Sequence, residues 1–180
     1  MTDWPSEWTS ISQEFSQRLS KLKMVIFDVD GVFTDGTILR DELGNEQRRF
    51  SVLDGHGISR LRDLGIFVGV VSREPSEITK SRMEKLKMDE IHIGSRDKSK
   101  TLKEILNRRK LDSNFVAFMG DDIPDLAAFS EVGVKLAPAN AQPQIRNQAD
   151  WISKASGGNG AVREVCEVII YSIENSRQSD

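Results

Sequence analysis

The sequence contains a single cysteine and no long apolar run, and these two absences narrow its class. Cys166 has no second cysteine with which to form an intramolecular disulfide. No stretch offers the roughly 20 consecutive apolar residues that a membrane-spanning helix needs, and none suits a signal peptide. We therefore expect a cytoplasmic protein that does not bind a membrane.

Basic stretches are also scarce. The formal net charge is −3, and the one local run of cations is Arg108-Arg109-Lys110. A nucleic-acid partner is therefore not expected. With 38% hydrophobic and 29% charged residues, the 180-residue chain has the composition of an ordinary globular domain. A chain of this length can bury about 70% of its unfolded surface.

Short apolar runs alternate with amphipathic segments along most of the chain. Repeated alternation of strand and helix is typical of a parallel sheet covered on both faces. The sequence therefore predicts an α/β fold, a three-layer Rossmann-like sheet with helices on both faces. Strands are expected at 24–27, 66–71, 90–93, 115–119, 134–137 and 151–152.

Two segments stand outside this alternation. Residues 1–22 carry apolar side chains three or four positions apart, which predicts an amphipathic N-terminal arm ahead of a core over 23–180. This arm packs on its own domain or on a neighbouring subunit. Segments 37–40 and 46–50 flank a glycine-containing loop and predict a small β-hairpin flap. The apolar positions of the arm are Trp4, Trp8, Ile11, Phe15, Leu19 and Leu22.

The first predicted strand ends in two carboxylates, Asp28 and Asp30, which are followed by Gly31. Within a strand the two side chains would share a face. Two anionic groups that close together cost free energy unless a cation lies between them. We expect a magnesium ion at this point.

Further polar side chains follow the other strands. In folds of this kind ligands bind beyond the carboxyl ends of the strands, so topology alone would gather these residues in one crevice. Ser72 follows the second strand, Lys98 comes just after the third, and Asp121, Asp122 and Asp125 follow the fourth.

These residue types suit phosphoryl transfer. Magnesium prefers oxygen ligands, which Asp28, Asp121 and the backbone carbonyl of Asp30 would supply. Asp28 would attack phosphorus to form an aspartyl phosphate. Asp30 would protonate the leaving sugar oxygen and later deprotonate the attacking water.

The remaining polar residues would support that reaction. Ser72 would donate a hydrogen bond to a phosphoryl oxygen, and Lys98 would neutralise charge in the transition state. Asp122 and Asp125 would orient the waters of the metal or Lys98. Each residue alone also has a structural explanation, such as a helix N-cap for Ser72 or for Asp121 and Asp122. Their joint order, each after its own strand, favours the functional interpretation.

At these residues the sequence resembles the haloacid dehalogenase superfamily of phosphatases. More narrowly, it resembles the 3-deoxy-D-manno-octulosonate 8-phosphate (Kdo 8-phosphate) phosphatases. The superfamily motifs match 28–31, Ser72, Lys98 and 120–125, and the narrower resemblance extends over 24–171. It rests on 28–36, on 50–58 with Asp54-Gly55-His56-Gly57, and on 157–166.

The resemblance implies a magnesium-dependent phosphomonoesterase that acts on a sugar-acid phosphate of cell-surface polysaccharide synthesis. It also implies a homotetramer, whose subunits border one another's active sites. The sequence independently leaves no room for a cap domain between Asp30 and Ser72 or between Ser72 and Lys98. A non-catalytic oligomerisation module is a remote alternative, which the retained acids oppose.

Five residues are candidates for substrate binding. Gly157–Gly160 is either a flexible loop before a helix over 161–173 or, as the resemblance implies, a mobile segment that reaches a neighbouring site. Arg163 beside it could meet an anionic group. His56 could contact substrate or cap the helix that follows. The other three candidates are Arg73, Glu74 and Lys85.

The substrate itself stays open between two sugar acids. Kdo 8-phosphate phosphatases usually carry Thr-Gly-Arg after the second strand, where this chain has Ser72-Arg73-Glu74. Related phosphatases for nine-carbon acids, such as 2-keto-3-deoxynononic acid 9-phosphate, are similar in having glutamate at this position. They also carry a lysine that Lys85 would match. The family favours Kdo 8-phosphate, whereas Glu74 and Lys85 favour the nine-carbon substrate.

Overall fold

Six parallel strands form the central sheet of a computed structural model that describes residue 6 and residues 10–179. Their order is β5-β4-β1-β6-β7-β8, and every pairing is parallel. The chain reverses its direction of winding at β1, so a crevice opens beyond the carboxyl end of that strand. The strands are β1 (Met24–Phe27), β4 (Phe67–Ser72), β5 (Glu90–Ile93), β6 (Val116–Met119), β7 (Val134–Ala137) and β8 (Trp151–Ile152).

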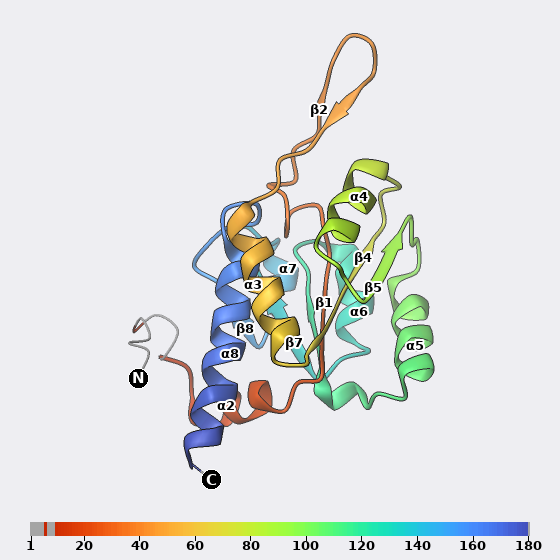
Figure 1. Cartoon of the computed structure of the whole chain (residues 1–180). Helices are drawn as coiled ribbons and strands as arrows, with labels where there is room; N and C mark the ends of the chain where they lie inside the picture. The colour runs from red at the N-terminus through yellow and green to blue at the C-terminus, as the bar shows by residue number, and fades with distance from the viewer. Residues whose placement is uncertain (1–5, 7–9, 180) are drawn as a thin grey trace.

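Helices cover both faces of the sheet, as predicted (Figure 1). Alternate residues of β1 enter two separate cores, with Val25 and Phe27 in one and Met24 and Ile26 in the other. The first core is covered by α2 (Gln13–Ser20), α3 (Val52–Asp63), α4 (Glu77–Lys85) and α8 (Ala161–Ser179). The second is covered by α5 (Lys98–Arg109), α6 (Leu126–Phe129) and α7 (Pro143–Arg146).

The predicted N-terminal arm is described in part. Helix α2 begins after Ser12, whose Oγ accepts the N–H of Phe15 at 3.2 Å. Phe15 and Leu19 are buried, and α2 contacts α8, so this part of the arm packs on its own domain. The expected apolar positions Trp4 and Trp8 lie outside the described residues.

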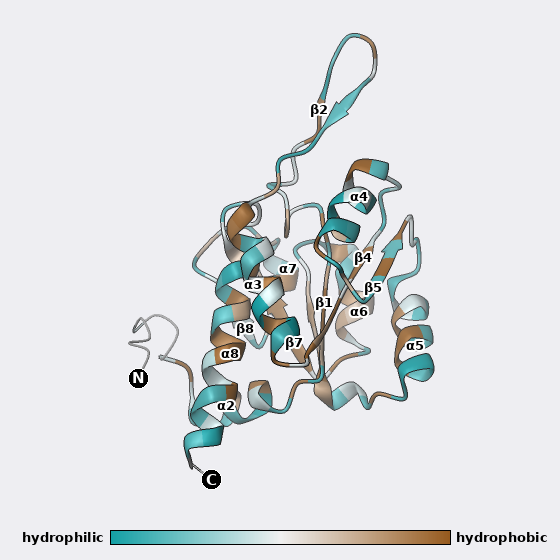
Figure 2. Ribbon diagram, viewed as in Figure 1, coloured by the Kyte–Doolittle hydropathy of each residue, from teal (hydrophilic) through white to brown (hydrophobic). Residues whose placement is uncertain are grey.

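The predicted flap is present as a short hairpin that projects above α3 and α4 (Figure 1). Its antiparallel strands β2 (Leu39–Arg40) and β3 (Glu46–Gln47) are shorter than expected. The loop between them folds around Asp41, whose Oδ1 accepts the N–H of Asn45 at 2.8 Å. Figure 2 shows the hairpin as mainly hydrophilic, in contrast to β4 below it. Between β1 and α5 the chain forms this hairpin, α3, β4, α4 and β5, and no cap domain.

Helix α3 begins earlier than expected. The segment Asp54-Gly55-His56-Gly57 lies inside it rather than ahead of it. A Cβ atom on Gly57 would lie 3.0 Å from the Cβ of Cys166 on α8, so the glycine lets the two helices approach closely. Packing against α8 thus offsets the low helix propensity of glycine here.

Helix α8 is longer than expected and reaches Ser179. Among the helices within the described ranges, none combines the length and the apolar character needed to cross a membrane.

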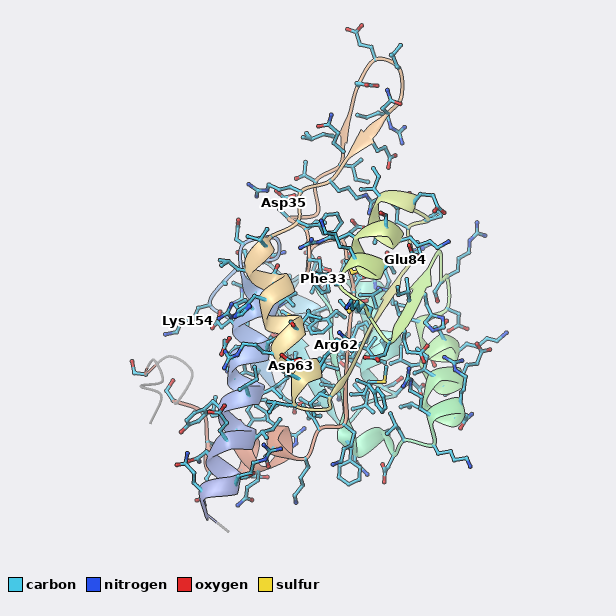
Figure 3. The ribbon with its side chains drawn as sticks, viewed as in Figure 1. Phe33, Asp35, Arg62, Asp63, Glu84 and Lys154 are labelled. Atoms are coloured by element: carbon cyan, nitrogen blue, oxygen red, sulfur yellow. The ribbon has the colours of Figure 1, made fainter. Side chains whose placement is uncertain are left out.

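The loop after β1 is anchored by an aromatic contact. Phe33 packs edge-on against Phe27 with ring centroids 5.4 Å apart, and both side chains are buried. Figure 3 shows Phe33 inside the molecule and Asp35 above it at the base of the hairpin. This contact fixes the loop that carries Asp30.

Candidate active site

A cavity of about 620 Å³ opens beyond the carboxyl ends of β1, β4 and β6. The structure gathers there most of the residues that the sequence singled out. Arg96, in the loop before α5, also lines it and was not predicted, and Ile38 contributes from the base of the flap. The predicted residues in the lining are Asp28, Asp30, Ser72, Arg73, Glu74, Lys98, Asp121, Asp122 and Asp125.

Lys98 is the central cation of the site. Its Nζ lies 2.8 Å from Asp28 Oδ1 and 2.5 Å from Asp125 Oδ1, and its side chain is 4% exposed. Burial alone would lower the pKa of Lys98, but the two carboxylates raise it above its ordinary value. Lys98 is therefore a buried ammonium aimed at Asp28 and not a solvated residue at the start of a helix.

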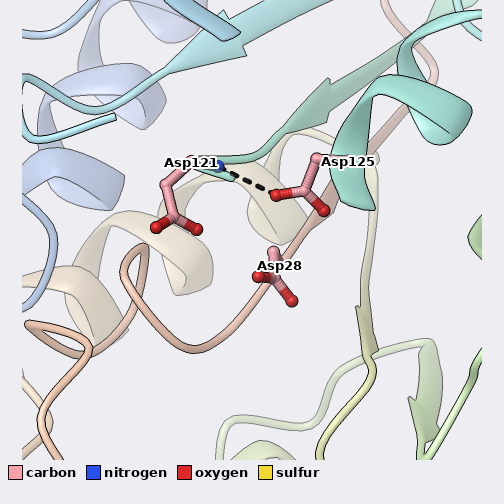
Figure 4. A group of neighbouring side chains, drawn as sticks. All are labelled: Asp28, Asp121 and Asp125. Carbon is pink, nitrogen blue, oxygen red and sulfur yellow. Dashed lines mark hydrogen bonds between the residues drawn. The ribbon is translucent and has the colours of Figure 1, made fainter. Parts of the chain in front are cut away.

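Three carboxylates converge in this part of the site, and Figure 4 shows those of Asp28, Asp121 and Asp125. One oxygen each of Asp28, Asp121 and Asp125 lies within 4.8 Å of the others. Burial raises the pKa of Asp28 to about 7, with repulsion from Asp125 adding to it and Lys98 opposing it. Burial, followed by repulsion from Asp28 and Asp125, raises the pKa of Asp121 to about 8. The cluster therefore resists full ionisation unless a further cation joins it.

The donor set fits a hard divalent cation such as magnesium. Asp121 Oδ1 is buried and accepts no hydrogen bond from the described part of the chain, as expected of an oxygen that faces a metal ion. Asp125 is different, because its Oδ1 accepts a hydrogen bond from Lys98 and its Oδ2 accepts the N–H groups of Asp121 and Asp122 at 2.9 and 3.2 Å. Asp28 and Asp121 remain as the carboxylates with free ligand capacity.

Asp122 and Ser72 have distinct local roles. The carboxylate of Asp122 accepts the N–H of Ile123 at 2.8 Å and caps the short 3₁₀ helix Ile123–Asp125. Ser72 ends β4 and is 1% exposed. The N-cap of α4 is Ser76, whose Oγ accepts the N–H of Thr79 at 3.3 Å. The capping explanation therefore applies to Asp122 and not to Ser72.

Asp30 is held by a residue that sequence reasoning missed. Arg48, just after β3, donates from Nη1 to both Asp30 oxygens at 2.6 and 2.9 Å. The side chain of Arg48 is fully buried, whereas that of Asp30 is 28% exposed at the cavity.

Asn140 was also missed, and it holds the same loop from the other side. Its Nδ2 donates to the carbonyl of Gly31 at 3.0 Å, and its Oδ1 accepts the N–H of Gly157 at 2.7 Å. Gly31 itself lies against Asp121, because a Cβ atom there would be 2.0 Å from Asp121 Oδ2. Asn140 follows β7, so the rule that polar residues gather after strand ends could have found it.

The glycine-rich segment contacts the loop after β1 of its own chain. That it also reaches a neighbouring subunit stays a prediction. A Cβ atom on Gly157 would lie 1.9 Å from the carbonyl oxygen of Gly31. The N–H of Gly158 donates to the carbonyl of Val32 at 3.1 Å. Glycine is required here because only a backbone without side chains can approach the loop after β1 so closely.

Three of the residues predicted to bind substrate do not line this cavity. His56 is exposed on α3, and Lys85 is exposed at the C-terminal end of α4. Arg163 donates from Nε to the buried carboxylate of Glu167 at 2.6 Å. A substrate contact by any of the three stays a prediction.

Comparisons with known proteins agree with this geometry. The family model of haloacid dehalogenase-like hydrolases matches residues 71–165. A 3-deoxy-D-manno-octulosonate 8-phosphate phosphatase (KdsC) from Yersinia pestis is 32% identical over 162 residues, which cover 90% of this chain and 87% of the relative.

Solved structures extend the likeness to three dimensions. The crystal structure of a 3-deoxy-D-manno-octulosonate 8-phosphate phosphatase from Moraxella catarrhalis, in complex with magnesium, phosphate and KDO, is 33% identical with a TM-score of 0.88. It aligns over 94% of this chain and 97% of that chain. A cobalt-bound deoxy-D-mannose-octulosonate 8-phosphate phosphatase from Haemophilus influenzae is 34% identical with a TM-score of 0.84, over 91% and 95% of the two chains.

Proposed function

The chain belongs to the haloacid dehalogenase-like hydrolases and, among them, to the 3-deoxy-D-manno-octulosonate 8-phosphate phosphatases, and on that premise we propose its reaction. It is a magnesium-dependent phosphomonoesterase that hydrolyses Kdo 8-phosphate to Kdo and phosphate. The observation that carries this proposal is the buried cluster of Asp28, Lys98 and Asp121 at the strand ends. A non-catalytic module would have no use for so costly a cluster.

Asp28 and Asp121 would hold the magnesium ion, together with the backbone carbonyl of Asp30. The free oxygen of Asp121 and the raised pKa values of both carboxyls support this assignment. When bound, magnesium neutralises the acidic cluster and polarises a phosphoryl oxygen.

In the first step a carboxylate oxygen of Asp28 forms a bond to phosphorus while the bond from phosphorus to the sugar oxygen breaks. Asp30 gives a proton to that sugar oxygen, so the sugar acid leaves as an alcohol. In the second step Asp30 takes a proton from the attacking water, whose oxygen forms a bond to phosphorus while the bond from phosphorus to the Asp28 oxygen breaks. This releases phosphate and restores the Asp28 carboxylate. Lys98 stabilises the charge that develops beside Asp28, and Ser72 donates to a phosphoryl oxygen.

The nucleophile can be tested directly with Asp28→Asn. The amide cannot attack phosphorus, so turnover should disappear while circular dichroism shows an intact fold. Phosphate release from Kdo 8-phosphate in the presence of magnesium is the measurement. Appreciable turnover by this variant would contradict the assignment of Asp28.

The nine-carbon acid phosphate remains a second candidate substrate because Glu74 lines the cavity. Lys85, the other residue that favours it, lies at the far end of α4. We expect Kdo 8-phosphate to have the higher kcat/KM of the two. A tenfold or larger preference for 2-keto-3-deoxynononic acid 9-phosphate would overturn the assignment of the eight-carbon substrate.

We also propose a homotetramer that acts in the cytoplasm. The flap supports the assembly, because Ile38, Leu39 and Leu43 are exposed by 43, 61 and 88% on a hairpin that is otherwise mainly hydrophilic. Burying these side chains at an interface would stabilise a complex. The buried, unpaired Cys166 suits a reducing compartment. Light scattering should give four times the mass of one chain, and a monomer at working concentration would exclude the tetramer.

A further inference from the structure

Arg48 is a fully buried cation to which the reaction described above assigns no task. It follows β3 and reaches from the base of the flap to the loop after β1. Its Nη1 donates to both carboxylate oxygens of Asp30 and, at 3.2 Å, to Thr79 Oγ1 on α4.

This burial is costly for the protein. Nε and Nη2 of Arg48 are buried and have no hydrogen-bond partner within the described residues, although Glu46 Oε2 lies 3.9 Å from Nη2. Removing a charge from water costs free energy unless its hydrogen bonds are replaced. A structural arginine would be expected to use more of its donors. Arg48 uses Nη1 alone, and its two shorter hydrogen bonds go to the Asp30 carboxylate, whereas the third goes to Thr79. The carboxylate is therefore the main partner of Arg48.

The geometry of the contact leaves Asp30 free to react. Both hydrogen bonds to Asp30 come from one nitrogen, and each uses one acceptor position on one oxygen. A carboxylate has roughly four such positions, so about two stay free. The open side of the Asp30 side chain faces the cavity. Without Arg48 this carboxylate would rotate among several side-chain conformations.

We propose that Arg48 is a positioning residue, which holds the Asp30 carboxyl group in the orientation that delivers a proton to the leaving-group oxygen. This inference rests on the proposed function, in which Asp30 is the proton donor. The proton moves from Asp30 to the sugar oxygen as the Asp28–phosphorus bond forms and the phosphorus–sugar oxygen bond breaks. Because Arg48 stands directly after β3, the orientation of Asp30 is tied to the position of the flap.

Substrates that differ in their need for a proton provide the test. An alkyl phosphate such as Kdo 8-phosphate needs protonation of its leaving oxygen, whereas p-nitrophenyl phosphate releases a stable phenolate without it. With magnesium present, single-turnover release of the alcohol or phenol would be measured for Arg48→Met, Arg48→Lys and Asp30→Asn. Arg49→Met is the matched control, because Arg49 is the next residue and its ion pair within the described residues is an exposed one with Asp35 at 3.1 Å.

We expect Arg48→Met to slow release from the alkyl ester about a hundredfold, the usual effect of a slightly misplaced catalytic group. Release of nitrophenol should change by less than about threefold, since it needs little general acid catalysis. Arg48→Lys keeps a cationic donor and should slow release from the alkyl ester about tenfold, again with little effect on the release of nitrophenol. This variant provides the test if Arg48→Met does not fold. Arg49→Met should match the wild type on both esters.

Equal losses on both esters would show a general structural role and overturn the proposal. Asp30→Asn separates the role of Asp30 from that of Arg48. If Asp30→Asn shows the selective loss and the Arg48 variants do not, only the role of Arg48 falls. If Asp30→Asn is not selective either, Asp30 is not the proton donor, and the proposed mechanism falls together with the role of Arg48.

Discussion

Asp54 shows what burial does to a carboxyl group at some distance from the reacting atoms. The residue is 1% exposed on α3, and its Oδ1 accepts the N–H of Arg163 at 3.0 Å, at the start of α8. Its Oδ2 has no hydrogen-bond partner within residues 10–179. Burial raises the pKa of Asp54 from its ordinary value of 3.8 to about 6. The acid therefore joins two helices but costs stability when it is ionised.

Asp54→Asn should change how stability depends on pH. Because its pKa is higher in the folded than in the unfolded state, the folded protein binds more protons between about pH 4 and 6, and the free energy of unfolding falls as pH rises through this window. A shift of this size corresponds to about 3 kcal/mol. Urea unfolding from pH 4 to pH 8 should show the wild type losing stability relative to Asp54→Asn.

The matched control is Asp63→Asn on the exposed end of the same helix (Figure 3). This variant should reproduce the wild-type slope. If Asp54→Asn also retains the wild-type slope, the ionisation of Asp54 is not what opposes folding in this window.

Individual site residues differ in how far the sequence reveals them. Lys98 and Asp121 follow predicted strands within a few residues, and strand order brings them to Asp28. Arg48 gives no such signal, because in the sequence it is one of two adjacent arginines at the end of a hairpin. Only the folded path of the flap shows which of the two turns inward.

At the scale of elements, the loop between β8 and α8 acts on the site without lining it. It rests on the loop after β1, and Asn140 joins the two. Any shift of this contact would displace Gly31, which lies against the carboxylate of Asp121.

Gly157→Ala should therefore lower both stability and turnover. Its Cβ would meet the carbonyl oxygens of Gly31 at 1.9 Å and Thr34 at 2.8 Å, and backbone atoms cannot yield as a flexible side chain would. We expect a loss of about 1–3 kcal/mol, as is usual for overpacking. Thermal unfolding and kcat are the measurements. Asn159→Ala, at an exposed position of the same loop, should leave both unchanged, and a wild-type result for Gly157→Ala would show that the two loops move apart freely.

Elements were predicted best where apolar runs are bounded by polar or glycine residues. Strands β5, β7 and β8 lie at the predicted residues. The start of α3 was placed too late because glycines usually end helices, whereas here they serve contact with α8. The strands of the flap are shorter than predicted. The flap projects from the domain, so little packing against other elements supports a longer pairing.

At the scale of the whole molecule, we expect the acidic cluster to make the stability of the protein depend on magnesium. Two carboxyls with pKa values of about 7 and 8 oppose folding at neutral pH unless a cation compensates them. Magnesium at a hundred times its Kd should add about 2.7 kcal/mol. For a chain of this size that corresponds to a rise of roughly 5–10 °C in Tm.

Calorimetry with and without magnesium measures this rise in the absence of substrate. Asp121→Asn should melt at a Tm that depends little on magnesium. An equal rise in the variant and the wild type would place the ion somewhere other than on Asp121.

The fold class was predictable because alternating strands and helices leave few ways to cover a parallel sheet. The close approach of distant loops was not predictable, since it depends on backbone contacts that leave no periodic pattern in the sequence. Gly157 meeting Gly31 is one such contact.

The contact between α2 and α8, together with the one between Gly157 and Gly31, has a consequence for synthesis on the ribosome. The nascent chain carries its nucleophile loop long before the segment that braces it emerges. At 5–20 residues per second, Gly157 is added roughly 6–25 seconds after Gly31. During that interval α8 has not yet been synthesised and cannot cover Phe15 and Leu19. The growing chain therefore exposes apolar surface that chaperones can bind. We expect hydrolysis to begin only once α8 has left the exit tunnel.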